Sequence, residues 1–426
     1  MSEHIQPIRG MSDILPAETP GWQAVERVLK NVMRQYGYHE IRIPVVERTE
    51  LFKRSIGEGT DIVEKEMYTF DDRNNESLTL RPEATAGIVR AGISNSLLYN
   101  QKQKLWFTGP MFRYERPQKG RYRQFHQFDV EALGFAGPDI DAEIIVMAAR
   151  IWAELGIGDV ELQLNSLGTS ESRQSYRKIL HSYFSDHEDQ LDEDSLKRLQ
   201  RNPMRILDSK NPALAELISA APQITDHLDA ESVDHFGILQ ELLADAGIKP
   251  VLNSRLVRGL DYYSRTVFEW VTDKLGAQGA ICSGGRYDGL VEHLGGKPTP
   301  AIGWGMGLER LVAMVELQQD EALQLVPEIY IVAVGEATLR AGFGLAERLR
   351  SEHGFNVEFN CGGGSFKSQF KRADRSGAEV ALILGEAELA SGEVGLKLLR
   401  EKSEQVPVSL NEVGAKLESV LVELST

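Results

Sequence analysis

The sequence predicts an α+β fold over residues 1–325, with a helical insertion at about 170–250, and a separate α/β domain over residues 327–426. Three observations support this prediction. Strand-like segments at 105–115 and 125–134 form a long hairpin in the first part. A charged, helix-patterned stretch then interrupts the strand-rich sequence. Near the C-terminus, short apolar strands alternate with helices, which is typical of an α/β domain.

The composition agrees with a large globular protein of more than one domain. The chain has 426 residues, of which 42% are hydrophobic and 26% charged, and these values exclude disordered and low-complexity proteins. No apolar run approaches the ~18–20 residues that a membrane helix needs, and the N-terminal residues lack a signal pattern. We therefore expect a cytoplasmic protein that does not contact a membrane.

Charge and cysteine content narrow the classes of function. The net charge of -16 argues against indiscriminate binding of nucleic acid, but it is compatible with a local basic face. The two cysteines, Cys282 and Cys361, lie far apart without CxxC spacing. This excludes a disulfide framework and a cysteine zinc site, and it fits a reducing compartment.

Hydrophobic periodicity predicts the elements before the insertion. Residues 18–36 carry an apolar stripe at helical spacing that ends at Gly37. The alternating segment 39–47 predicts a strand, and Pro44 within it favours a sheet edge or an interface. The further elements are a strand at 77–82, a helix from 85 to about 98, a helix at 140–155 and a strand at 160–168.

After the insertion, strand-like sequence resumes at 256–271. Glycine-dense turns are predicted at 284–289 and 295–307, and a helix at about 308–316. Pro327 is the next boundary. The sequence beyond it alternates as β-α-β-α-β, for which right-handed crossovers are expected.

A basic hairpin tip is the most informative motif. Residues 110–125 contain five basic side chains against the single acid Glu115. On a chain of net charge -16, this tip is either a solvated loop or a contact for polyphosphate or nucleic acid. Aromatic residues between the basic ones, including Phe125, offer a stacking surface for bases and favour the contact. The basic residues are Arg113, Arg116, Lys119, Arg121 and Arg123.

Two motifs have an ordinary structural explanation as well as a functional one. Glu83 and Thr85 follow a strand and precede a helix, so they fit helix capping. In LVRGLDYY (256–263), Arg258 and the tyrosine pair fit a turn and a core.

Two glycine-rich motifs follow. The paired glycines of SGGRYDGL (283–290) allow either a close backbone approach or a tight hairpin. GWGMGLERL (303–311) superficially fits GxGxxG, but no βαβ unit with an acid ~20 residues further on follows, so a dinucleotide fold is rejected. Arg310, in the first helical turn, can point a guanidinium at a phosphate.

In their order along the chain, these segments resemble the histidyl-tRNA synthetase family of class II aminoacyl-tRNA synthetases. The resemblance covers essentially the whole length. It implies a first domain built on an antiparallel sheet flanked by helices, an anticodon-binding α/β domain and a homodimer. The segments that resemble family motifs are 39–47, FRYERPQKGRYRQFHQFDVE (112–131), GWGMGLERL, LVRGLDYY and SGGRYDGL.

The resemblance implies ligation of L-histidine to the 3′ end of its cognate tRNA through a histidyl-adenylate. ATP is the expected substrate, accompanied by Mg²⁺, whose ligands the sequence does not identify. Arg113 would hold the α-phosphate and the carboxylate, Arg258 the α-phosphate, and Arg310 the γ-phosphate. Glu115 would meet the adenine amino group, and Phe125 would stack on the purine. Guanidinium groups suit these roles because they bind oxygens bidentately and stay charged.

The resemblance also implies a histidine pocket, which needs an anion for the ammonium group and partners for two ring nitrogens. Ala84 stands where the family as readily has glycine, so its methyl group would narrow the pocket slightly. A site that bonds both nitrogens can reject unmatched amino acids by ~10⁴ or more without editing. The implied residues are Glu83, Thr85 and Gln127 near the ammonium group, Glu131, Tyr262 and Tyr263 near the imidazole, and Tyr287 closing the pocket.

For the tRNA, the resemblance implies three contact regions. The insertion would lie over the acceptor stem, and the hairpin with Gln118, Arg121 and Arg123 would meet the acceptor end. In the C-terminal domain, the basic window 365–377 is either a solvated helix face or a contact for the tRNA backbone. Its candidate residues are Lys367, Lys371 and Arg372.

Two alternatives to the ligase fit the sequence less well. A relative of the regulatory subunit of ATP phosphoribosyltransferase would bind histidine only as a signal, and it needs neither the basic hairpin nor a C-terminal domain. A generic nucleic-acid-binding protein leaves Glu83, Glu131 and the tyrosine pair unexplained. The sequence therefore favours the ligase, with three arginines converging on a bound triphosphate.

Overall fold

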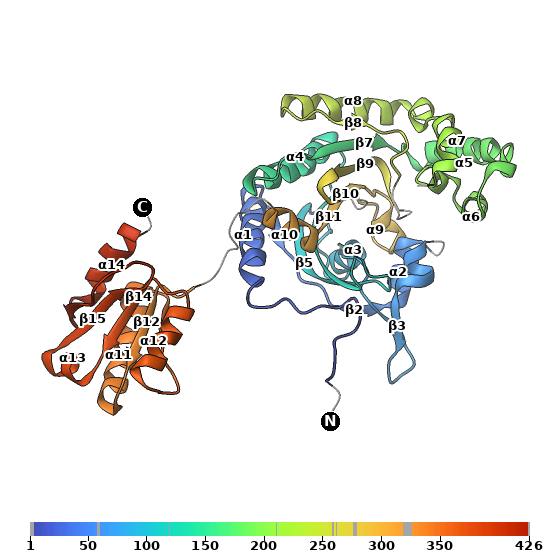
Figure 1. The fold of residues 1–426 in the computed structure, drawn as a ribbon. Coiled ribbons are helices and arrows are strands. Elements are labelled where there is room, and N and C mark those ends of the chain that lie inside the picture. The colour runs from blue at the N-terminus through green and yellow to red at the C-terminus, as the bar shows by residue number, and fades with distance from the viewer. Residues whose placement is uncertain are drawn as a thin grey trace. The chain divides into compact units, whose positions relative to one another are not determined.

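The chain forms two compact units, Met1–Ala322 and Leu323–Thr426. Each unit has its own sheet and its own hydrophobic core (Figure 1). The computed structural model describes residues 4–57, 60–118, 120–209, 211–257, 260, 262–275, 279–317 and 326–424. No helix in these ranges is long and apolar enough to cross a membrane.

An eight-stranded sheet forms the centre of the first unit, in the order β1-β5-β6-β11-β10-β9-β7-β8. Neighbouring strands are antiparallel except for the end pairs β1–β5 and β7–β8. The α+β fold on an antiparallel sheet, which the sequence predicts, is confirmed. The strands are His39–Glu40 (β1), Gln103–Phe112 (β5), Gln124–Leu133 (β6), Glu161–Ser166 (β7), Val251–Leu252 (β8), Ser264–Val271 (β9), Ala280–Arg286 (β10) and Ala301–Gly307 (β11).

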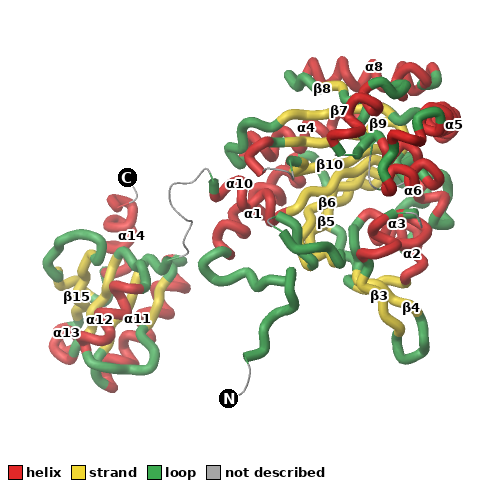
Figure 2. Tube along the Cα trace, turned by 45° about the vertical axis from the view of Figure 1, so that its right-hand side comes forward, coloured by secondary structure: helices red, strands yellow, loops and turns green. Residues whose placement is uncertain are grey.

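Four helices share a core with this sheet. They are α1 (Thr19–Gln35), α4 (Pro138–Glu154), α8 (Ala230–Asp245) and α10 (Leu308–Glu316). Each turns an apolar stripe toward the large sheet, whose strands are yellow in Figure 2. The predicted helices at 18–36, 140–155 and 308–316 therefore form close to their expected bounds.

Alternation along β6 and β11 decides which side chains reach each face of the sheet. Phe128 and Trp304 point into the core, where their rings stack with centroids 6.2 Å apart. Because successive side chains of a strand point to opposite faces, the odd-numbered positions of 127–131 and 303–307 share the other face. At these positions that face carries polar residues and glycines, beside a second apolar cluster that includes Phe107 and Leu133.

Segment 39–47 is not the single strand that the sequence predicts. The chain leaves the large sheet after β1, and β2 (Val46–Arg48) belongs to a three-stranded sheet, β2-β4-β3. Pro44 has no N–H to donate, and the carbonyls of Ile43 and Pro44 instead accept hydrogen bonds from Nη1 of Arg81 at 2.7 and 3.1 Å. The neighbouring elements are α2 (Thr49–Ile56), the π-helical turn η1 (Ile62–Glu66), β3 (Tyr68–Asp71), β4 (Ser77–Leu80) and α3 (Thr85–Ser94).

The sequence predicts turns at 284–289 and 295–307, but β10 and β11 run through these segments at the centre of the sheet. Only α9 (Leu290–His293) and loops separate the two strands. Glycine is locally unfavourable in strands, yet the packing requires it here. A Cβ atom at Gly284 would lie 2.2 Å from the carbonyl oxygen of Gly303. The close backbone approach, not a tight hairpin, therefore explains the paired glycines.

The stretch predicted as a helical insertion is helical and has an apolar core of its own. Tyr176 and Phe184 of α5 are buried with Leu199 of α6. Tyr263 and Val267 belong to the same cluster, so the insertion packs on β9. Its elements before α8 are α5 (Ser170–Ser185), η2 (Glu188–Gln190), α6 (Glu193–Arg201), η3 (Pro203–Ile206), η4 (Pro212–Leu214), α7 (Ala215–Ser219) and η5 (Ile224–His227).

The second unit is built on a five-stranded sheet, β13-β12-β14-β15-β16. Its first three strands are parallel, which confirms the predicted β-α-β-α-β pattern. β15 and β16 add two antiparallel strands that the sequence does not predict. The elements are β12 (Ile329–Ala333), α11 (Glu336–His353), β13 (Val357–Phe359), α12 (Phe366–Arg375), β14 (Val380–Leu384), α13 (Glu386–Ser391), β15 (Glu393–Leu398), β16 (Val406–Ser409) and α14 (Val413–Leu424).

Candidate active site

Gly303, Gly305 and Gly307 of β11 lie on the polar face of the large sheet, and we call these three residues the glycine floor. Gln127, Asp129 and Glu131 point from β6 toward this face, and their register partners on β11 are Gly307, Gly305 and Gly303. On β10, Ser283 and Gly285 are the partners of Gly305 and Gly303. Since glycine has no side chain, the space above the backbone of β11 is open to the three polar groups of β6.

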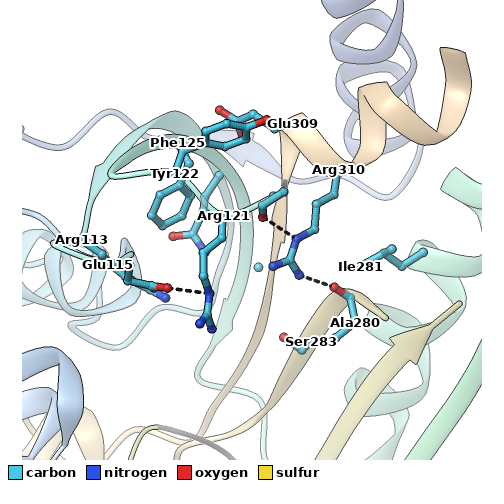
Figure 3. Close-up of a pocket in the computed structure, with 14 residues that line it drawn as sticks. Arg113, Glu115, Arg121, Tyr122, Phe125, Ala280, Ile281, Ser283, Glu309 and Arg310 are labelled. Atoms are coloured by element: carbon cyan, nitrogen blue, oxygen red, sulfur yellow. Dashed lines mark hydrogen bonds and ion pairs between the residues drawn. The ribbon is translucent and has the colours of Figure 1, made fainter. Parts of the chain in front are cut away.

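A cavity opens at one end of this floor (Figure 3). Gly305 and Gly307 form part of its wall. Six residues that the sequence predicts as site residues line this one cavity. They are Arg113, Glu115, Arg121, Phe125, Gln127 and Arg310.

Two of the three predicted catalytic arginines are positioned by backbone carbonyls. Nε of Arg113 donates to the carbonyl of Pro82 at 2.8 Å, and its guanidinium lies 5.3 Å from the centroid of the Phe125 ring. Arg310 donates through Nη1 to the carbonyl of Ala280 at 2.7 Å. Arg258 lies outside the described residues. Arg113 and Arg310 thus share a cavity although they lie on different elements.

Three guanidinium groups line the cavity, together with the carboxylates of Glu115 and Glu309. Burial lowers the pKa of Arg310, and the nearby cations Arg121 and Arg113 lower it further, against the opposing effect of Glu115. Nε of Arg121 lies 2.5 Å from a carboxylate oxygen of Glu115, as Figure 3 shows. A bound anion would relieve the repulsion among the guanidinium groups.

A buried carboxylate pocket lies along the same strand. Glu131 is 1% exposed, and it accepts hydrogen bonds from Oγ1 of Thr85 at 2.6 Å and from the hydroxyl of Tyr287. Burial raises the pKa of Glu131 well above its usual value, although both hydroxyl donors act in the opposite direction. Glu83, also buried, accepts from the backbone N–H of Ala86 at 3.0 Å. Glu83 therefore supplies a capping group at the start of α3.

The predicted tyrosines gather around these carboxylates. The ring of Tyr262 lies 4.7 Å from that of Tyr263 and 5.6 Å from that of Tyr287, measured between centroids. Burial raises the pKa of Tyr262, with Tyr263 and the carboxylates Glu83 and Glu131 acting in the same direction. Ala84 is fully buried in the apolar cluster that contains Tyr287.

The predicted tRNA contacts on the hairpin hold its tip together. Backbone N–H groups of Gln118 and Arg121 donate to each other's carbonyls at 3.1 and 2.9 Å. The guanidinium of Arg123 lies 3.9 Å from the centroid of the Tyr114 ring, and its Nε donates to the carbonyl of Glu115 at 3.1 Å. These contacts give the hairpin tip an ordered conformation, and the tip carries basic side chains.

In the second unit, the predicted contacts Lys367, Lys371 and Arg372 are exposed on α12. Nε of Arg372 donates to Oδ1 of Asn360 at 2.8 Å, and its Nη2 donates to the carbonyl of Gly363. Arg372 thus fixes the glycine-rich loop before α12.

Sequence reasoning missed Asp129 and Glu309. Asp129 is buried between Gln127 and Glu131 in the pattern of β6, and the two-residue alternation of the predicted strand could have identified it. The carboxylate of Glu309 accepts from the backbone N–H of His126 at 2.8 Å, which ties α10 to the hairpin. No local pattern predicts that contact, because the two residues are far apart in sequence.

Resident metal ligands are not evident. In the part of the chain that the structure describes, no group of three or more His, Cys, Asp or Glu side chains is arranged to hold a metal ion.

Gly303→Ala is expected to lower the free energy of unfolding by ~1–3 kcal/mol through overpacking. The new Cβ atom would lie 1.6 Å from Oε2 of Glu131 and 2.7 Å from the carbonyl oxygen of Val130. It would therefore displace the carboxylate from Thr85 and Tyr287. Gly307→Ala is the matched control, because its Cβ meets nothing within 4 Å. Denaturant unfolding of both variants tests this, and equal stability losses would contradict it.

Comparisons with known proteins identify the family of each part of the chain. A family model described as histidyl-tRNA synthetase matches residues 10–311, and one described as anticodon binding domain matches residues 328–420. The structure of apo S. aureus histidyl-tRNA synthetase is similar with a TM-score of 0.82 and 34% sequence identity, over 97% of this chain and 100% of that chain.

Two more distant structures share the fold. Histidyl-tRNA synthetase from Nostoc is 21% identical with a TM-score of 0.69, over 98% of this chain and 100% of its own. An ATP phosphoribosyltransferase regulatory subunit/histidyl-tRNA synthetase from Bacillus halodurans is 21% identical with a TM-score of 0.65, over 87% of this chain and 97% of its own.

Proposed function

The chain belongs to the histidyl-tRNA synthetase family, and from that premise we propose that it ligates L-histidine to the 3′ end of its cognate tRNA. The first step forms histidyl-adenylate from histidine and ATP and releases diphosphate. The second transfers histidine to the tRNA and releases AMP. The observation that carries this proposal is one cavity that joins the guanidinium groups of Arg113 and Arg310 to the polar strand leading to Glu131.

The first step brings two anions together. The histidine carboxylate attacks the α-phosphate, a bond to that phosphorus forms, and the bond to the leaving diphosphate breaks. Arg113 offsets charge on the attacking and α-phosphate oxygens, and Arg310 holds the γ-phosphate. Arg258 is proposed for the α-phosphate as well. Phe125 stacks on the purine, and Glu115 accepts from its amino group.

Selection of histidine relies on the buried carboxylate. Glu131 is fixed by Thr85 and Tyr287, so its remaining lone pairs can accept an imidazole N–H in one orientation. Tyr262 and Tyr263 supply further polar partners beside the ring. Amino acids that leave these buried groups unpaired are rejected.

We also propose partners beyond the two small substrates. Mg²⁺ arrives with ATP, and no protein ligand is assigned to it. Two copies of the chain form a homodimer in the cytoplasm. The hairpin tip meets the acceptor end of the tRNA, the insertion lies over the acceptor stem, and α12 meets the tRNA backbone.

A histidine-sensing regulator is the second candidate, because the Bacillus halodurans protein shares the fold. Two observations favour the ligase over it. Residues 328–420 match an anticodon-binding domain. The cavity beside the histidine pocket is lined by guanidinium groups, which a sensor of histidine alone does not need.

ATP–diphosphate exchange with each of the twenty amino acids tests the proposal. Exchange is expected with histidine alone, because the proposed pocket has partners for both nitrogens of an imidazole. Histidine binding without exchange would support the regulator instead. Exchange with a different amino acid would refute the substrate assignment.

The double change Lys367→Glu and Lys371→Glu is expected to reduce tRNA charging, measured as kcat/KM for tRNA, by at least ~10-fold. Both side chains are exposed on α12, and charge reversal there repels the phosphate backbone. ATP–diphosphate exchange should stay unchanged. Lys416→Glu, an exposed change on α14, is the matched control. Unchanged charging in the double variant would remove α12 from the tRNA interface.

A further inference from the structure

We propose that Asp129 contributes a second carboxylate, with Glu83, to the subsite that binds the α-ammonium group of the amino-acid substrate. This inference rests on the proposed function and deepens it. The family resemblance implies Glu83, Thr85 and Gln127 for that group, whereas the juxtaposition of Asp129 with Gln127 over Gly305 comes from the structure alone.

Asp129 lies beside residues that line the cavity. Asp129 is 4% exposed on β6 and is the register partner of Gly305. A Cβ atom at Gly305 would lie 2.6 Å from Oδ1 of Asp129 and 3.3 Å from Nε2 of Gln127. The two side chains therefore converge on the space that the glycine leaves open. Gln127 and Gly305 both line the cavity.

Each of these two side chains has one acceptor atom without a donor. Within the described part of the chain, Oδ2 of Asp129 and Oε1 of Gln127 are buried and have no hydrogen-bond partner. Unpaired buried acceptors are costly and rare, so a pair of neighbouring ones indicates a missing ligand with N–H groups. An ammonium group has three such donors and no acceptor.

The nearby cations do not neutralise Asp129 by contact. Arg81 donates through Nε to the carbonyl of Pro110 at 2.9 Å, and Arg113 donates to that of Pro82. Burial and the neighbouring Glu83 raise the pKa of Asp129, while Arg113 and Arg81 lower it. A cation bound between the two carboxylates would favour their charged forms.

The hydrogen bonds of Thr85 also bear on the roles predicted for the histidine-binding residues. Thr85 donates its hydroxyl hydrogen to Glu131 at 2.6 Å, and its hydrogen bonding also lowers the pKa of Glu83, so it lies between the two carboxylates and helps to orient the imidazole partner as well. Glu83, Thr85, Gln127 and Asp129 then form the proposed ammonium subsite. The groups proposed for the two ends of histidine thus follow one another on one face of β6, with Glu131 two residues beyond Asp129.

Asp129→Asn in the full-length protein tests this inference. It keeps the shape of the side chain and removes the charge. We expect the KM for histidine in ATP–diphosphate exchange, and the inhibition constant of histidinol, to rise by ~10–100-fold. Histidinol keeps the ammonium group and lacks the carboxylate. 3-(Imidazol-4-yl)propionate has the carboxylate and lacks the ammonium group, so its inhibition constant should stay within ~2-fold, because the lost interaction is with the ammonium group.

Three results would overturn the inference. Equal weakening of both inhibitors would show a merely structural role, and no weakening of either would remove Asp129 from the subsite. A change confined to the KM for ATP would place it in the nucleotide or Mg²⁺ site. Absence of exchange in the wild-type protein would instead refute the proposed function.

Two further variants keep the test decisive. Glu143→Gln is the control, because that carboxylate lies on α4 and bonds to Nζ of Lys104 at 2.7 Å, away from the cavity. If Asp129→Asn does not fold, Asp129→Ser also removes the charge, and the inhibition constants of the same two inhibitors are measured on it. The same selective loss of histidinol supports the inference, and parallel losses overturn it.

Discussion

Arg113→Ala is expected to reduce the rate of ATP–diphosphate exchange by ~10²–10³-fold, the usual cost of removing one donor from a transition-state anion. The guanidinium is held by the Pro82 carbonyl and lies over Phe125, so it is oriented before any ligand binds. The loss should fall on kcat more than on the KM for histidine, because the charge that it offsets develops during the reaction. Arg113→Lys should recover only part of the rate, since an ammonium lacks the planar fork.

Arg116→Ala is the matched control for this experiment. Arg116 lies on the same hairpin but is exposed and does not line the cavity. Its exchange rate should equal that of the wild type. Equal losses in the two variants, or a loss confined to the KM for histidine, would contradict the proposed role of Arg113.

Arg286→Ala is expected to lower the free energy of unfolding by ~3–5 kcal/mol, because it leaves a buried carboxylate without its cation. Arg286 of β10 and Asp141 of α4 are both fully buried and paired through Nη2 and Oδ1. Asp141 also accepts from Oγ1 of Thr266 at 2.6 Å and bonds to Nε2 of His235 at 2.9 Å. This network joins four elements, so its loss should also weaken the packing of α8.

Denaturant unfolding measures this effect. Lys30→Ala, which removes a partly exposed pair with Glu26 on α1, is the control and should change stability little. Burial raises the pKa of Asp141, but the hydrogen bond from His235 and the charge of Arg286 lower it below its usual value. The stability that Asp141 contributes is therefore present above its unfolded pKa of about 4. It should be lost as the pH falls through the lower folded value, and a stability that is constant through this acid range would contradict the network.

Local patterns in the sequence predict those parts of the fold that depend on near neighbours. The apolar stripes of α1, α4 and α10 predict the helices, and alternation predicts the β5–β6 hairpin. The prediction of a single strand at 39–47 is wrong because the guanidinium of Arg81, which is remote in sequence, binds the backbone carbonyls that a neighbouring strand would otherwise bind. The predicted turns at β10 and β11 are wrong because glycines are typical of turns, and their role in close packing becomes evident only once the neighbouring backbone is known.

The residues of the candidate site also divide into those that motifs in the sequence identify and those that depend on contacts remote in sequence. Motif resemblance identifies Arg113, Phe125 and Arg310, which line one cavity. It does not identify Asp129, whose importance depends on the space above Gly305 and on the unpaired atom of Gln127. Alternation along the predicted strand places Asp129 on the same face as Gln127 and Glu131, but the open space beside it depends on the register between β6 and β11, which pairing across the sheet decides.

The glycine floor limits how this protein could be altered to take another amino acid. Alanine is the smallest step away from glycine, and at Gly303 its methyl group already collides with a carboxylate and a carbonyl. At Gly303 and Gly305, beside Glu131 and Asp129, the floor offers no room for gradual adjustment. Directed evolution toward a larger or differently shaped amino acid would therefore have to reshape the walls, at Tyr262, Tyr287 or the side chains of β6, and leave β11 as it is.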